Sequence, residues 1–151
     1  MPVEVTYAES IDVPAPIEKV FDYRLDFTNS PEYLPYARNV RRVDGGNELG
    51  PGAEFRSDLT MPGAPTTESY IRVVEVDRPK HIVFDVGAAG RRGRETSTFE
   101  PLPDGGTRVE FSIVMQLPDE ARENLPAHIE RGRTSFRIEL DNIREIFARR
   151  K

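Results

Sequence analysis

Residues 108–147, RVEFSIVMQLPDEARENLPAHIERGRTSFRIELDNIREIF, contain the change of hydrophobic period that decides the fold. Up to Leu117 the apolar side chains stand at alternate positions, which is typical of a strand with one buried face. From Pro126 onward they recur every three, four or seven residues, which predicts an amphipathic helix about 36 Å long. Pro126 either opens this helix or kinks it. We therefore expect a sheet that ends at this strand and a long helix that packs on it.

The chain before this stretch predicts more strands and two short helices. Near-alternation over residues 3–13 indicates a first strand, and residues 14–21 begin a short amphipathic helix after proline. Ser30, as N-cap, begins a second short helix that Pro35 limits. From about residue 38, glycine- and proline-rich turns separate five or six further strands. The predicted class is α+β, with a curved antiparallel sheet of six to seven strands around a long C-terminal helix.

Composition excludes several classes of function. A chain of 151 residues without repeats or linkers predicts a single domain over 1–151. The net charge of -5 argues against nucleic-acid binding, and no apolar run approaches the length of a membrane span. The absence of cysteine and of a secretory start leads us to expect a cytoplasmic protein. Nucleotide-binding and hydrolase motifs are missing, and His81 and His128 stand alone, so we expect no cofactor and no metal site.

Four segments resemble one superfamily. Residues 11–21 are similar to its opening, residues 30–35 to its second helix, residues 74–79 to its strand ends and residues 99–109 to its penultimate hairpin. Together with the order of elements, they resemble the START-like or Bet v 1-like superfamily, also called SRPBCC, which includes the polyketide cyclase/dehydrase and lipid transport group. The resemblance implies a helix-grip fold with an internal cavity over nearly the whole chain.

Members of this superfamily bind lipids, quinones, hormones or polyketides, assist chaperones or close aromatic rings, so the resemblance implies a class of functions. Our first expectation is binding, transport or sequestration of a small hydrophobic ligand such as a lipid, quinone, isoprenoid or polyketide. One alternative is a polyketide cyclase, dehydratase or aromatase, although the chain has no tryptophan to stack on a polyketide. Another is a cochaperone-like protein-interaction module. The oligomeric state stays open between monomer and dimer.

The enzyme alternative would use polar side chains that face the cavity. Tyr70 or Glu95 would be the general acid or base, and Arg72 would stabilise an enolate. Two registers are open for this strand. If the even-numbered positions face inward, Tyr70 and Arg72 do so; if the odd-numbered positions do, Ile71 and Val73 are inside instead. A single bulge would invalidate either extrapolation.

The predicted ligand-binding residues lie on the faces that alternation and helical spacing turn inward. They are Phe55, Ser57, Tyr70, Phe84, Glu95, Ser97, Phe111, Ile113, Met115, His128, Ile129, Gly132 and Phe136. Gly132 interrupts the apolar stripe of the helix, which makes room either for a ligand or for a large side chain from the sheet. The loop at residues 87–94 is interpreted first as a solvated basic turn; its arginines could also recognise an acidic ligand head.

Overall fold

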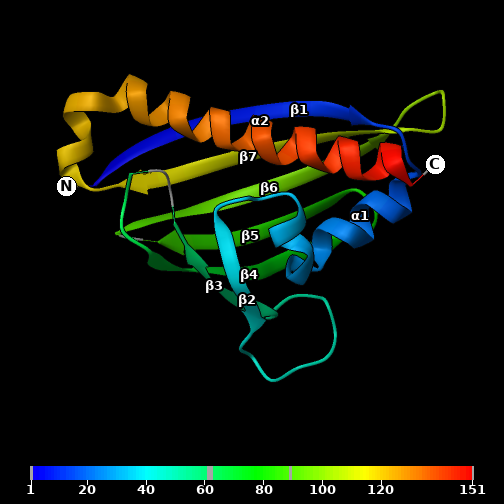
Figure 1. The fold of residues 1–151 in the computed structure, drawn as a ribbon, viewed down its shortest axis with the longest axis horizontal. Coiled ribbons are helices and arrows are strands. Elements are labelled where there is room, and N and C mark those ends of the chain that lie inside the picture. The colour runs from blue at the N-terminus through cyan, green and yellow to red at the C-terminus, as the bar shows by residue number, and fades with distance from the viewer. Residues whose placement is uncertain (1, 61–62, 89, 151) are drawn as a thin grey trace.

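The computed structural model describes residues 2–60, 63–88 and 90–150. In these ranges a seven-stranded antiparallel sheet curves around the long helix α2 (Figure 1), which confirms the predicted helix-grip fold. The strand order is β1-β7-β6-β5-β4-β3-β2, so the first strand pairs with the last. The strands are β1 (Val3–Val13), β2 (Ala37–Arg42), β3 (Glu54–Leu59), β4 (Thr67–Asp77), β5 (His81–Ala88), β6 (Arg91–Pro101) and β7 (Thr107–Leu117).

Two short helices follow β1, as the sequence predicted. Helix α1 (Ile17–Leu25) begins after Pro16 and buries the face that carries Val20 and Phe21. The second is a 3-10 helix, η1 (Phe27–Glu32), whose cap is Asp26, with its carboxylate accepting from the Thr28 N–H at 3.1 Å. The predicted N-cap Ser30 was therefore wrong. Because Asp26 caps the chain one turn earlier, Ser30 lies inside η1 and is buried.

Helix α2 (Leu125–Arg149) follows a second 3-10 helix, η2 (Asp119–Asn124), and Pro126 lies in its first turn, so this proline opens the helix. The C-terminal half of α2 packs tightly, with Leu140 and Ile143 each 1% exposed against the sheet and α1. In its first turns, Leu125 and Ile129 pack instead against a smaller cluster that includes Leu117 and Ala121. Of the helices among the described residues, none is long and apolar enough to cross a membrane.

A bulge in β4 determines which side chains face α2. The pairing between β4 and β5 shifts between Val73 and Glu75. Before the shift the odd-numbered positions face inward, and Val73 is 1% exposed; after it Val76 packs against the core. The second of the two predicted registers is thus observed up to Val73.

Candidate functional site

A cavity of about 250 Å³ lies between the sheet and the N-terminal half of α2. Most of its wall is apolar, because residues such as Val5 of β1, Ile71 of β4, Val86 of β5 and Ile113 of β7 line it. Helix α2 contributes His128, Arg131, Gly132, Ser135, Phe136 and Glu139, which are spaced one turn apart on one face. The helix that closes the core at its C-terminal half therefore covers an open space at its N-terminal half.

Gly132 accommodates Tyr7, a residue of β1. A Cβ atom placed at Gly132 would lie 2.2 Å from Cζ of Tyr7 and 2.3 Å from its hydroxyl oxygen. The ring also contacts Phe136, with 5.2 Å between the ring centroids. Of the two interpretations of this glycine, the structure favours the one in which it receives a large side chain from the sheet. Burial, with Glu95 nearby, raises the pKa of Tyr7 to about 12, so its phenol stays protonated.

We expect Gly132→Ala to destabilise the protein by about 1–3 kcal/mol, even though alanine favours a helix by about 1 kcal/mol over glycine. The reason is that the new methyl group overlaps the Tyr7 ring, which Phe136 holds in place. Urea unfolding measures the loss. In a Tyr7→Ala background the same substitution should become neutral or stabilising, and an unchanged loss there would show that Tyr7 is not its cause.

The deepest polar group of the cavity is Arg24, at the end of α1, which is 3% exposed. Its Nη2 donates to Glu95 at 2.5 Å and its Nη1 to the Tyr33 hydroxyl at 3.0 Å. Its Nε donates to Ser97 at 3.2 Å, and Nη1 lies 3.5 Å from Glu139. Residues from α1, β6, α2 and the end of η1 thus meet at one guanidinium.

Aromatic rings surround the same guanidinium. Its Cζ lies 4.0 Å from the centroid of Phe111 and 4.9 Å from that of Phe27, with Phe84 and Tyr33 at 5.4 and 5.6 Å. A planar cation over ring faces gains cation–π energy that grows when water is excluded. Burial lowers the pKa of Arg24, but Tyr33, Glu95 and Glu139 outweigh this effect and raise the pKa above its usual value, so the guanidinium stays protonated.

One positive charge faces two carboxyl groups in this cluster. Burial and, to a smaller extent, Glu95 raise the pKa of Glu139 while Arg24 lowers it, and the net pKa is about 8. Burial also raises the pKa of Glu95, against the effect of the shorter bond to Arg24. Because Glu95 is the closer partner, we assign the negative charge to Glu95 and the proton to Glu139 at neutral pH. A neutral carboxylic acid and a charged guanidinium therefore lie beside the cavity.

The structure separates the predicted ligand-binding residues into two groups. The cavity wall includes Ser57, Tyr70, Glu95, Ile113, Met115, His128, Gly132 and Phe136. The others lie in the packed core: Phe55, Phe84, Ser97 and Phe111 around Arg24 and its neighbours, and Ile129 in a smaller cluster with Leu117 and Ala121. Ser97 is fully buried and reaches the site through its bond to Arg24.

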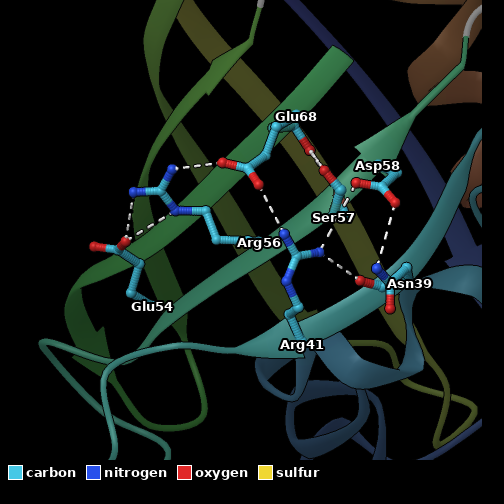
Figure 2. Close-up of polar contacts among 8 residues, drawn as sticks. Asn39, Arg41, Glu54, Arg56, Ser57, Asp58 and Glu68 are labelled. Atoms are coloured by element: carbon cyan, nitrogen blue, oxygen red, sulfur yellow. Dashed lines mark hydrogen bonds and ion pairs between the residues drawn. The ribbon is translucent and has the colours of Figure 1, made fainter. Parts of the chain in front are cut away.

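Although Tyr70 borders the cavity, its side chain lies on the outer face of the sheet, where it covers Gly87, and the side chain of Arg72 lies on the same face. Tyr70 pairs across the sheet with Arg56, whose guanidinium lies 5.5 Å from its ring. Figure 2 shows Arg56 in a network of exposed ion pairs with Glu54 and Glu68. Arg72 is exposed and pairs with Asp85, which also binds Arg94. Of the three candidates for catalysis, only Glu95 has its side chain in the interior, because the odd-numbered register prevails in β4.

Arg24 and Glu139 were not predicted, although each leaves a signal in the sequence. Arg24 stands three residues after Phe21, on the buried face of α1, and Glu139 stands three residues after Phe136 on the apolar stripe of α2. A charged residue on a buried apolar face needs a partner of opposite charge, because an unpaired buried charge is costly. The partner itself could not be predicted, because it depends on how α1, β6 and α2 meet.

The histidines do not gather with acids into a metal site. His81, at the start of β5, has its Nε2 2.6 Å from a carboxylate oxygen of Glu75, while His128 faces the cavity. Across residues 2–60, 63–88 and 90–150, no group of three or more His, Asp or Glu could hold a metal ion.

Comparison with known proteins extends these observations. The chain resembles the Zhui aromatase/cyclase from Streptomyces sp. R1128 with a TM-score of 0.78 and 18% identity, covering 98% of this chain and 96% of that one. Its TM-score to norcoclaurine synthase from Thalictrum flavum is 0.74 at 15% sequence identity, and the match covers 99% of this chain and 98% of that one. A START superfamily protein from Mycobacterium smegmatis has a TM-score of 0.79 at 12% sequence identity, and the match covers 97% of this chain and 99% of that one.

At these identities the solved structures show a shared fold and nothing finer. A search of the curated proteins found no match to the sequence. A family model, however, matches residues 4–148, which is nearly the entire chain and includes every element that forms the cavity. By its sequence as well as its fold, this chain belongs to the polyketide cyclase/dehydrase and lipid transport family.

Proposed function

We propose that this protein binds a small hydrophobic molecule in the cavity under α2, as a carrier, sequestering protein or sensor. The observation that carries the proposal is the position of the open space. Leu140 and Ile143 are almost fully buried farther along α2, so the fold can pack its interior tightly, yet it leaves about 250 Å³ open near Gly132. Ligand pockets usually measure about 300–1,000 Å³, so we expect a ligand at the small end of the range.

The chemistry of the wall supports an apolar ligand that carries a polar group. Residues such as Val5, Ile71, Val86 and Ile113 would contribute about 25 cal/mol for each Å² of apolar surface that they remove from water. At the deep end Glu139 can donate its proton to a ligand carbonyl or hydroxyl, because it is neutral at pH 7. The apolar wall supplies affinity, and this acid orients the ligand.

A substitution that fills the cavity tests the proposal. Ser135 lines the cavity from α2, and Ser135→Trp should weaken binding of 1-octanol or of toluene, followed by NMR, by at least about tenfold. The reason is that an indole occupies much of a 250 Å³ space. Since the chain has no tryptophan, the introduced indole also reports its own burial by fluorescence.

The matched control is Thr134→Trp, which adds the same group one position away on the exposed side of α2 and should leave probe affinity unchanged. Equal loss in both variants, or none in Ser135→Trp, would place probe binding outside the cavity. Wild-type protein that takes up neither probe, and that carries no small molecule in native mass spectrometry after purification from its own host, would contradict the proposal.

The second candidate function is a cyclase or dehydratase, and the protonated Glu139 beside Arg24 favours it. A carboxylic acid with a pKa of about 8 is suited to donate a proton to a carbonyl or a leaving hydroxyl, and a buried guanidinium can stabilise the enolate. Conversion of a poly-β-keto thioester that Glu139→Gln slows at least about 100-fold, with binding retained, would favour this candidate. A cochaperone-like module is less favoured, because it needs no internal space.

A further inference from the structure

The two ends of the cavity differ in charge and in exposure. At the deep end, the side chains of Arg24, Glu95 and Glu139 are buried together. At the other end, the wall is formed by Arg91 at the start of β6 and by His128 and Arg131 of α2. Arg91 and His128 are half-buried and Arg131 is exposed, so this basic end is the one that opens to solvent.

The β5–β6 turn and the chain before η2 border this opening. Gly90, in the turn, has a positive φ of 78°, and a Cβ placed on it would lie 3.8 Å from Pro118. The neighbouring Ala89 lies outside the described residues. The arginines that follow this turn divide between the two sides of β6, because successive residues of a strand point to opposite faces. Arg91 faces the cavity, whereas Arg92 is exposed on the outer face.

The three basic residues at the opening approach one another without an acid between them. Nη2 of Arg91 lies 3.4 Å from Nδ1 of His128, and burial, Arg91 and Arg131 together lower the pKa of His128. Within the described ranges, neither Arg91 nor Arg131 forms an ion pair with a carboxylate. Farther along the same helix, by contrast, Arg133 binds Glu9 at 2.7 Å.

We propose that the ligand of the cavity is an anionic amphiphile, whose charged head lies between Arg91, Arg131 and His128 while its apolar part extends under α2. This inference rests on the proposed function. An anion at this position would offset the positive charge of the two guanidinium groups around His128 and accept charge-assisted hydrogen bonds from them. With Nδ1 of His128 facing Arg91, the neutral imidazole carries its proton on Nε2, which adds a third donor.

The shared chemistry of the head is a negative charge with at least two acceptor oxygens, which both a carboxylate and a phosphate provide. The volume limits the tail. A space of about 250 Å³ equals that of about eight water molecules at about 30 Å³ each, which suits a chain of roughly that many heavy atoms. Octanoate, octyl phosphate and the uncharged 1-octanol are therefore probes of matched length.

The experiment is a titration of the full chain, labelled with ¹⁵N, by each of the three probes, followed by NMR. We expect octanoate or octyl phosphate to bind at least about tenfold more tightly than 1-octanol, which is the difference that one charge-assisted hydrogen bond makes. Arg91→Gln should remove that preference, so that the two anions and 1-octanol bind with similar affinities. Whichever anion binds more tightly identifies the kind of head.

Arg92→Gln is the matched control, since it removes the same charge from the adjacent residue on the outer face and should change nothing. The inference is overturned if 1-octanol binds as tightly as both anions, or if Arg91→Gln and Arg92→Gln have equal effects. If none of the three probes shifts the resonances of cavity residues such as Ile113 and Gly132, the proposed function fails together with the inference. Binding of 1-octanol alone leaves the proposed function supported and removes the anionic head.

Discussion

Replacing Arg24 by methionine is expected to lower the free energy of unfolding by about 3–5 kcal/mol at neutral pH, the usual cost of removing one partner from a buried ion pair. Methionine fills a similar volume, so the loss comes mainly from Glu95, whose carboxylate would keep no cation nearby. The Tyr33 hydroxyl and Ser97 would lose their bonds in the same step. Thermal unfolding should shift downward on the order of 10 °C.

The cause can be separated from a general loss of packing. In Arg24→Met combined with Glu95→Gln and Glu139→Gln, no buried charge is left without a partner, so much of the stability should return. Arg144→Met, on the exposed side of α2, controls for the loss of an arginine and should change stability by less than about 0.5 kcal/mol. A loss below about 1 kcal/mol in Arg24→Met would contradict the assignment of a buried negative charge to Glu95.

The fold could be predicted from the sequence because it depends on local periods. The alternation in β7 and the helical stripe of α2 each reflect which face is buried. Both patterns can be recognised even when the predicted bounds of the element are wrong by a few residues. Turn residues likewise separate the strands whatever the exact pairing. The predicted architecture was therefore confirmed, although the cap of η1 was not, since Asp26 and Ser30 are both good N-caps and only the path of the chain distinguishes them.

The candidate site was harder to predict because it depends on the register and on contacts between distant elements. In β4 the bulge near Val73 decides that Ile71 faces the cavity and that the side chains of Tyr70 and Arg72 do not. A bulge of one residue leaves no trace in a pattern of period 2 that is already irregular. Gly132 shows the opposite case: its position on the stripe indicated a space, but only the structure assigns Tyr7 to it.

The stability of the protein should fall as the pH rises from about 5 to 8, and Glu139 should account for much of the change. The pKa of this carboxyl is about 8 in the folded chain against 4.5 for the free side chain, so the folded state holds more protons in that window. Stability then decreases with pH by at most about 1.4 kcal/mol per unit for this one group. Below about pH 4.5 both states are protonated, and the contribution is constant.

Glu139→Gln isolates this contribution, because an amide copies the neutral acid and cannot ionise. The variant should be close to the wild type in stability near pH 5 and clearly more stable near pH 8, when both are unfolded by urea across the range. Groups far from the cluster cancel in the difference between the two proteins, whereas Glu95 is coupled to Glu139 and is part of the effect. Glu145→Gln, an exposed change on the same helix, controls for the loss of a carboxylate from α2 and should leave the pH dependence of the wild type in place. A constant difference for Glu139→Gln as well would mean that Glu139 ionises as it does in water. It would then not carry the proton that the cluster with Arg24 and Glu95 requires, and its role as a neutral donor to a ligand would be lost with it.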